Sequence, residues 1–303
     1  MISVVIPTHN RADLLMRAVQ SAVLQTYKDI EIIVVSDGST DNTAELMRVQ
    51  GKKDTRISFI EYHPAGGGNT ARNLGVECAS GEYVAFLDDD DEWMPNKLEK
   101  QMKVFAENPD IGLVCTGITV VYVDEKIRYN SIPNLQGDLR RQILLKNVIG
   151  TTSSVIVKKN LVLDTGGFDT KLIALQDYDL WIRICQRTKV GVVNEACLNY
   201  YNYTKSKQVS SDTIKYSDAF IHINKKYYDW FSELDLEEQR MKRYYECMLL
   251  ANKSIRNKDG KASTYLKQAL RIKRTKEALL SLLFMHLPYR CLLWVRSLWK
   301  IRI

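Results

Sequence analysis

Four consecutive aspartates, Asp88 to Asp91, directly follow the apolar run VAFL (84–87). Adjacent carboxylates repel one another, so such a run is either screened by water on a loop or gathered around a cation. The run follows a buried-strand pattern without a spacer, so at least Asp88 is expected near a sheet edge, where an unpaired carboxylate is costly. Mg²⁺ or Mn²⁺ prefers oxygen ligands and bridges phosphates, so either ion would suit these carboxylates. A solvated acidic loop is the alternative.

The aspartates do not form a calcium loop of the EF-hand type. Counting from Asp88, Glu99 occupies the required twelfth position. The sixth position, however, is Trp93 where the sharp turn requires glycine, and Pro95 follows. The sequence therefore excludes this calcium site.

Two other polar segments could bind a ligand. SDGSTDNT (36–43) contains the turn dipeptide Asp37-Gly38 and residues that can cap a following helix; Asp37 could equally accept a hydrogen bond from a base or a sugar. PAGGGNTARNLG (64–75) leads three glycines into a helix, but it has neither the Lys-Ser/Thr of a P-loop nor the GxGxxG spacing of a dinucleotide fold. Neither segment is decisive by itself.

The elements that would position these residues alternate between strand and helix patterns. Short β-rich runs are separated by segments with helical spacing; the runs are ISVVIP (2–7), EIIVV (31–35), ISFIEY (57–62) and YVAFL (83–87). This order predicts an α/β fold with a parallel sheet and helices on both faces. Ligands of such sheets lie beyond the carboxyl ends of the strands, where residues 7–10, 36–39 and 88–91 are found.

The second half of the chain is predicted to extend the sheet and then become helical. LVCTGITVVYV (113–123) and SSVIVKK (153–159) favour further strands in a mixed extension, and a helix is expected to start near Tyr178. Asp177 could act as the N-cap of that helix. The polar, aromatic stretch 199–212 indicates a linker or a lid, and the chain beyond it reads as helices.

Charge is distributed unevenly along the 303 residues, whose net charge is +7. Residues 261–303 contain ten Lys or Arg and one acidic residue, whereas the first 260 carry 33 basic and 35 acidic groups. The apolar stretch 278–299 is interrupted by two arginines, a histidine and a proline, so it is not expected to span a membrane. It fits a helix on an anionic membrane surface, with packing on the catalytic domain or in a homodimer as the alternative. No nucleic-acid-binding module is recognised, and no nucleic-acid partner is expected.

Six cysteines are scattered through the chain without CxxC spacing, and no signal-peptide pattern precedes the first strand. They are expected to be reduced thiols rather than zinc ligands or disulfides. This predicts a cytoplasmic protein.

Together these segments resemble glycosyltransferase family 2, the inverting nucleotide-sugar enzymes. The matching motifs, in the family's order, are VVIPTHNR (4–11), SAVLQTY (21–27), EIIVVSDGSTDNT (31–43), GGNTARNLG (67–75), GEYVAFLDDDDEW (81–93) and GGFD (166–169) with QDYDLWIRI (176–184). The resemblance covers about residues 2–210 and implies the GT-A fold, a Rossmann-like, mostly parallel sheet flanked by helices, here followed by an α-helical C-terminal region. It implies a nucleotide-sugar-binding half (1–110), an acceptor-binding half with the catalytic base (111–210) and a basic helical region (211–303).

The resemblance also implies roles for individual residues. Those expected to hold the nucleotide are Pro7, Thr8, Asn10, Asp37, Arg72, Asp88 and Asp89. Asp90 is expected to ligate Mn²⁺ or Mg²⁺, although the four-aspartate run leaves the register open by one. Asp177 matches the catalytic base, and Gln176 stands where the family usually has Glu. The family's lid histidine is missing, so Lys205 and Lys207 are the residues that could meet the diphosphate.

The implied activity is metal-dependent, inverting transfer of one sugar from a UDP-sugar to a glycan or glycolipid hydroxyl. The expected setting is lipid-linked surface polysaccharide at the cytoplasmic face of the inner membrane. No Gln-x-x-Arg-Trp motif is present, which argues against a processive synthase. Transfer onto polyprenyl phosphate is the alternative reaction, and an inactive membrane or assembly scaffold is the alternative class.

Overall fold

A computed structural model describes residues 1–203 and 212–298. Its first half contains four parallel strands, as the sequence predicted, and their spatial order is β3-β2-β1-β4. The strands are β1 (Ile2–Thr8), β2 (Ile30–Asp37), β3 (Ile57–Tyr62) and β4 (Tyr83–Phe86). The connecting helices are α1 (Ala12–Val23), α2 (Thr43–Lys53) and α3 (Gly68–Cys78). The loops that follow β1, β2 and β4 therefore meet at one edge of the sheet.

The same sheet continues beyond β4 in the order β8-β6-β9-β5, with β7 paired to β6. These strands are β5 (Glu92–Trp93), β6 (Ile111–Tyr122), β7 (Ile127–Ser131), β8 (Val155–Lys158) and β9 (Lys189–Asn202). Strand β8 is antiparallel to both β4 and β6, whereas β9 runs parallel to β6. The predicted mixed extension is confirmed, and the sheet crosses the predicted boundary near residue 110 without interruption.

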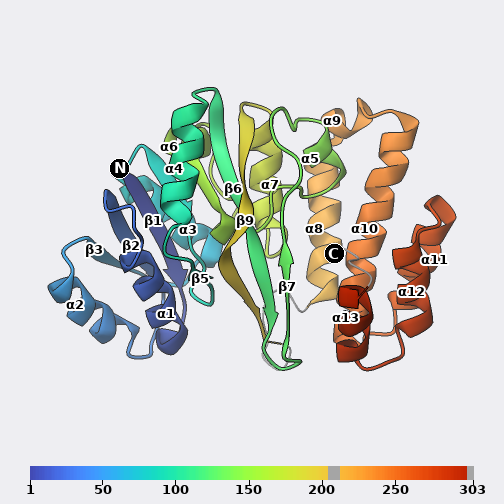
Figure 1. The fold of residues 1–303 in the computed structure, drawn as a ribbon, viewed down its shortest axis with the longest axis horizontal. Coiled ribbons are helices and arrows are strands. Elements are labelled where there is room, and N and C mark those ends of the chain that lie inside the picture. The colour runs from blue at the N-terminus through green and yellow to red at the C-terminus, as the bar shows by residue number, and fades with distance from the viewer. Residues whose placement is uncertain (204–211, 299–303) are drawn as a thin grey trace.

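Helices cover both faces of the sheet, and each face has its own core (Figure 1). Along β1, Ile2, Val4 and Ile6 pack with α1, α2 and α4 (Lys97–Glu107), whereas Val5 points to the opposite core. That second core contains α3, α5 (Gln142–Leu145), α6 (Lys159–Asp164), α7 (Gln176–Cys185) and α8 (Thr213–Lys226). Alternate residues of a strand point to opposite faces, so the unbroken apolar runs of the sequence are explained by a sheet that is buried on both sides.

The C-terminal region is helical, as predicted. A short α9 (Tyr228–Ser232) precedes α10 (Leu236–Asn257), whose first turn is closed by a capping box between Asp235 and Glu238. Three more helices, α11 (Ala262–Ile272), α12 (Lys276–Phe284) and α13 (Tyr289–Leu298), share a separate small core with α10. Helices α11 and α12 form the end of the molecule farthest from β3 and α2, whereas α13 packs near β7 (Figure 1).

Two predictions are wrong about where an element begins or ends. Helix α7 begins at Gln176, after Leu175 in a left-handed conformation (φ 57°), so Asp177 lies inside the first turn instead of capping it. Strand β9 includes residues 199–202, which were expected in the linker, because they pair with residues 119–122 of β6. Lys205 and Lys207 lie outside the described residues.

Candidate active site

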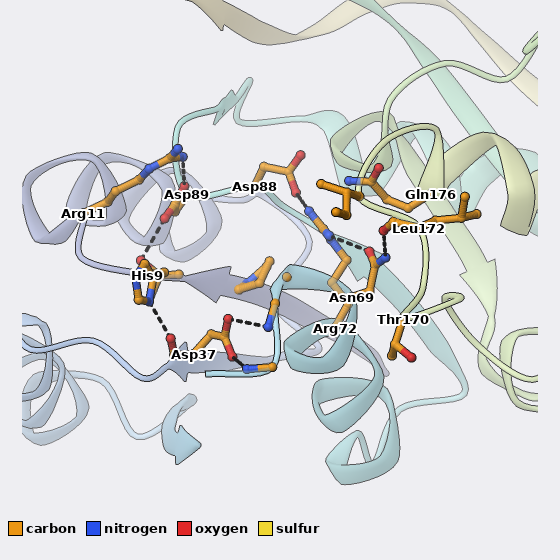
Figure 2. Close-up of a pocket in the computed structure, with 16 residues that line it drawn as sticks. His9, Arg11, Asp37, Asn69, Arg72, Asp88, Asp89, Thr170, Leu172 and Gln176 are labelled. Carbon is orange, nitrogen blue, oxygen red and sulfur yellow. Dashed lines mark hydrogen bonds and ion pairs between the residues drawn. The ribbon is translucent and has the colours of Figure 1, made fainter. Parts of the chain in front are cut away.

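A cavity of about 500 Å³ opens at the sheet edge where β1, β2 and β4 end. Figure 2 shows residues from the first two of these loops, from the aspartate run and from α3 around it, with residues 170–176 on the far side. Its lining includes the predicted Pro7, Thr8, Asp37, Arg72, Asp88 and Asp89, and also His9, Arg11, Asn69, Leu172 and Gln176. The residues that line this cavity thus come from positions up to about 170 apart in the sequence.

The four aspartates alternate between accessible and buried positions. The side chains of Asp88 and Asp90 are 25% and 17% exposed. Those of Asp89 and Asp91 are 7% and 0% exposed. Asp88 and Asp90 therefore have the more exposed side chains of the run, although Asp88 and Asp89 line the cavity and Asp90 does not.

Asp88 is held by contacts on both carboxylate oxygens. Arg72 Nη2 lies 2.6 Å from Oδ1, and the Thr152 hydroxyl donates to Oδ2 at 3.0 Å. The backbone N–H of Asp88 donates to the Ser153 hydroxyl. The turn η1 (Thr152–Ser154) thereby fixes the direction of Asp88, and Arg72 brings positive charge to the cavity.

Asp89 ties the aspartate run to the loop after β1. It accepts a hydrogen bond from the Thr8 hydroxyl at 2.8 Å and an ion pair from Arg11 at 3.1 Å. Burial raises the pKa of Asp89, while Arg11 and Thr8 oppose that change. Arg11 also lies 3.3 Å from Asp90 Oδ2, so one guanidinium bridges neighbouring carboxylates.

Asp91 is buried beneath the accessible pair. Its Oδ1 accepts from the backbone N–H of Tyr201 at 3.4 Å, and Oδ2 has no hydrogen-bond partner. Burial raises the pKa of Asp91 well above its usual range, and the charges of Asp90 and Asp88 raise it further. Burial and the neighbouring carboxylates thus both disfavour the charged form of Asp91.

Asp37 organises the glycine-rich loop. Its two carboxylate oxygens accept backbone N–H groups of Gly66 at 2.7 Å and Gly67 at 2.8 Å (Figure 2). Gly67 has φ +91°, a conformation that glycine adopts without strain. Asn10 uses its amide oxygen to accept the N–H of Thr40, and it is not among the residues that line the cavity. Both predicted nucleotide residues thus shape the walls of the cavity.

Asp177 lies beside this cavity, next to the lining residue Gln176. Its Oδ1 accepts the backbone N–H of Tyr178 at 2.8 Å, and Asn147 Nδ2 lies 3.4 Å from Oδ2. Burial raises the pKa of Asp177 to about 6; the Tyr178 N–H and Arg72 oppose this change, while Asp88 adds to it. A carboxylate with this pKa is mostly ionised at pH 7 and yet basic enough to take a proton.

The aspartates suit a Mg²⁺-type ion that is shared with a substrate. No group of three or more metal-ligating side chains occurs in residues 1–203 and 212–298. Such ions need only one or two carboxylates when phosphates and waters complete the shell. Asp88 lines the cavity, and Asp90, the predicted metal ligand, is the other partly exposed carboxylate of the run, although it is not among the lining residues; these two would hold the ion.

The family model described as glycosyl transferase family 2 matches residues 3–163, more than half of the chain. The chain belongs to this family. A Haemophilus influenzae protein named an uncharacterized glycosyltransferase is 29% identical over 88% of each chain. Escherichia coli WcaA, named a putative colanic acid biosynthesis glycosyl transferase, is 31% identical over 85% of this chain and 94% of its own. A longer Rickettsia felis relative is matched over only 36% of its length.

Solved structures share the fold of this glycosyltransferase. Staphylococcus aureus TarS residues 1–349 in complex with UDP-GlcNAc superposes with a TM-score of 0.64 at 17% identity, covering 98% of this chain and 88% of the other. The Pyrobaculum calidifontis mannosyltransferase PcManGT, in complex with GDP-Man and Mn²⁺, gives 0.62 at 17% identity, covering 99% and 88%. The predicted GT-A fold and transferase class are confirmed.

Several residues of the glycosyltransferase site were missed in the sequence. Arg11 is part of the VVIPTHNR motif, and its positive charge beside the first strand was a signal in the sequence. Its partners Asp89 and Asp90, however, are 78 and 79 positions away. Thr152, Ser153 and Asn147 carry no local pattern that would connect them to Asp88 or Asp177. Thr152 and Ser153 reach Asp88 because the turn η1 packs against β4, and Asn147 reaches Asp177 because α5 packs against α7.

Proposed function

We propose that this glycosyltransferase moves one sugar from a UDP-sugar to a glycan hydroxyl in an inverting, metal-dependent reaction that builds lipid-linked surface polysaccharide. The observation that carries the proposal is Asp177, a carboxylate with a pKa near 6 that interacts electrostatically with Asp88 and Arg72 of the large cavity. A basic carboxylate beside a charged, nucleotide-sized cavity is the arrangement that an acceptor-activating base requires.

In this reaction Asp177 removes the proton of the acceptor hydroxyl as its oxygen forms a bond to the anomeric carbon. The bond from that carbon to the diphosphate oxygen breaks, and the electron pair leaves with the nucleoside diphosphate. One displacement inverts the anomeric centre. Asn147 would keep the Asp177 carboxylate directed to the acceptor, and Arg72 would add positive charge beside the leaving group.

A Mn²⁺ or Mg²⁺ ion held by Asp88 and Asp90 would neutralise charge on the leaving phosphates. The Mn²⁺ in the PcManGT complex supports this choice of metal. The UDP-GlcNAc complex of TarS supports a uridine donor, and the colanic acid name of the WcaA relative supports a polysaccharide product.

The proposal is tested by incubating the protein with Mn²⁺ and a panel of UDP- and GDP-sugars, and by measuring release of the diphosphate. A UDP-sugar should be hydrolysed slowly without an acceptor, and Asp88→Asn should lose this activity together with UDP binding. The anomeric configuration of a transfer product, read by NMR coupling constants, should be opposite to that of the donor. If none of the donors is bound or hydrolysed, the scaffold alternative replaces the enzyme.

We further propose that the outer surface of α12 and α13 contacts an anionic membrane. Leu279, Leu283 and Trp294 are 47%, 71% and 60% exposed there. Exposed basic residues accompany them, namely Lys273, Arg274, Lys276 and Arg290. Apolar side chains that enter the headgroup region beside lysines and arginines are typical of helices that lie on such surfaces. No helix in residues 1–203 and 212–298 is long and apolar enough to cross a bilayer.

Flotation with vesicles that contain phosphatidylglycerol tests the membrane contact. The double variant Leu279→Gln, Leu283→Gln should float less, whereas Leu163→Gln on α6, which is also 47% exposed, should behave like the original protein. Equal flotation of all three proteins would refute the contact. A homodimer that dissociates in the double variant, with flotation unchanged, would assign the surface to subunit packing instead.

A further inference from the structure

A second cavity, of about 200 Å³, lies where strands β6, β7 and β9 meet helices α10 and α13. In Figure 1, α10 and α13 lie on the side of the sheet that carries β7. Four tyrosines line the cavity: Tyr122, Tyr129, Tyr200 and Tyr289. Helix α10 adds Asn252, Lys253 and Arg256, and the described lining contains neither Asp nor Glu. The cavity therefore combines aromatic rings with positive charge.

This tyrosine cavity adjoins the base and the aspartate run, although it shares no lining residue with the large cavity. Lys253 Nζ lies 4.2 Å from the centre of the Tyr216 ring, and the charge of Asp177 raises the pKa of both groups. On another wall, burial raises the pKa of Tyr200, and Asp91, Asp90 and Asp88 raise it further. Asp177 thus interacts with charged groups of both cavities.

The charges of the tyrosine cavity favour an anion. Burial and the charge of Arg256 lower the pKa of Lys253 to about 7, against the opposing effect of Asp177. Arg256 donates to the Asn202 side chain at 3.2 Å and to the Tyr203 carbonyl at 3.4 Å. Two cations in one partly dry space repel each other, so a ligand with negative charge would restore the protonated form of Lys253.

We propose that the tyrosine cavity is an acceptor subsite that binds an acidic sugar residue, that is, a sugar ring carrying a phosphate or a carboxylate group. This inference rests on the proposed function and specifies its acceptor. The tyrosine rings would pack against the apolar face of the sugar ring, while Lys253 and Arg256 would bind its anionic group. The volume is below the ~300 Å³ at which pockets for drug-sized ligands begin, which suits one sugar residue rather than a longer chain.

The test measures binding of four small probes in the presence of saturating UDP and Mn²⁺, by ligand-observed NMR titration. The probes are glucose, glucuronate, glucose 6-phosphate and inorganic phosphate. At least one of the two acidic sugars should bind about tenfold or more tightly than glucose, and the one that does identifies the anionic group. Equal affinity for glucose and both acidic sugars would overturn the proposal. If glucose 6-phosphate is the preferred sugar, inorganic phosphate that binds as tightly would also overturn the proposal, because the tyrosines would then contribute nothing.

Matched variants on α10 assign the binding to this cavity. Lys253→Met and Arg256→Gln should each lose about tenfold in affinity for the preferred acidic sugar and keep the affinity for glucose. Arg243→Gln, which removes one exposed charge from the same helix, should bind like the original protein. An unchanged preference in both cavity variants would refute the subsite. Donor hydrolysis in the same samples reports the proposed function separately, since these variants leave the UDP cavity intact.

Discussion

Replacement of Asp177 by Asn would separate the chemical role of this carboxylate from its cost to folding. Asparagine keeps an oxygen that can accept the Tyr178 N–H, and it fills nearly the same volume. It cannot take a proton from an acceptor. Loss of a general base lowers a rate by about 10²- to 10⁴-fold, so transfer should fall by that amount while UDP binding in the presence of Mn²⁺ stays unchanged.

The same replacement should stabilise the protein above pH 6. The pKa of Asp177 is about 6 in the folded protein and about 3.9 in an unfolded chain. Between these values the folded state binds more protons, so the free energy of unfolding falls as pH rises. Above pH 6 the ionised carboxylate costs up to about 3 kcal/mol. Because the side chain keeps some contact with solvent, we expect a gain of about 1–3 kcal/mol for the variant at pH 7.5.

The assay compares thermal unfolding of both proteins at pH 4 and pH 7.5 with transfer rates across the same range. The variant should melt a few degrees higher at pH 7.5 and equally at pH 4. The original protein should lose activity about tenfold per pH unit below pH 6. A variant that melts lower at pH 7.5, or that transfers sugar at the normal rate, would show that Asp177 is a structural residue and not the base.

Three other substitutions and the removal of metal should each alter a different property: stability, UDP binding, donor hydrolysis or rate. Asp179→Asn breaks the pairs of a fully buried carboxylate with Arg183 at 2.6 Å and Lys226 at 2.9 Å, so urea unfolding should show a loss of about 3–5 kcal/mol. Arg72→Gln leaves Asp88 without its cation and should weaken UDP binding by about tenfold or more in calorimetry. Removal of metal by EDTA should abolish donor hydrolysis, which Mn²⁺ should restore, without a change in circular dichroism; hydrolysis that survives EDTA would contradict the metal site. Asn147→Ala should lower the rate about tenfold and move the acidic limb of the pH–rate profile, with the KM for the donor unchanged.

The order of strands and helices in the first half was predictable because β1, β2 and β4 are buried on both faces. Such strands read as unbroken runs of β-branched and apolar residues, which few other elements produce. The short β5 and β7 lacked any such run, and β9 was not predicted at all; its last residues, which are tyrosines and asparagines, were assigned to a linker or lid. These residues belong to the strand through their pairing with β6, a contact that no local pattern encodes.

The candidate site was predictable where a single segment both follows a recognisable strand and carries the side chains that could bind a ligand. The aspartate run is such a segment, but it forms a turn in which the Asp91 N–H donates to the Asp88 carbonyl at 3.0 Å, so the different exposure of its four side chains could not be derived from strand alternation. The partners Thr152 and Asn147 were not predictable, since their roles arise from packing between distant segments. The proposed role of Lys253 was not predictable for the same reason, since α10 lies near Asp177 only through the packing of the C-terminal region beside the sheet.

The buried Asp179 has a consequence for chimeric enzymes. Two of its partners, Lys226 and the Tyr227 hydroxyl, are supplied by α8 and the residue after it, and Asp179 itself is one helical half-turn from Asp177. The helix that carries the proposed base is therefore stabilised by contacts with the C-terminal region, and it lies outside residues 3–163, which the family model matches. An exchange of acceptor preference between relatives should transplant residues 164–258 as one block, since a cut between α7 and α8 would separate a buried charge from its counterion.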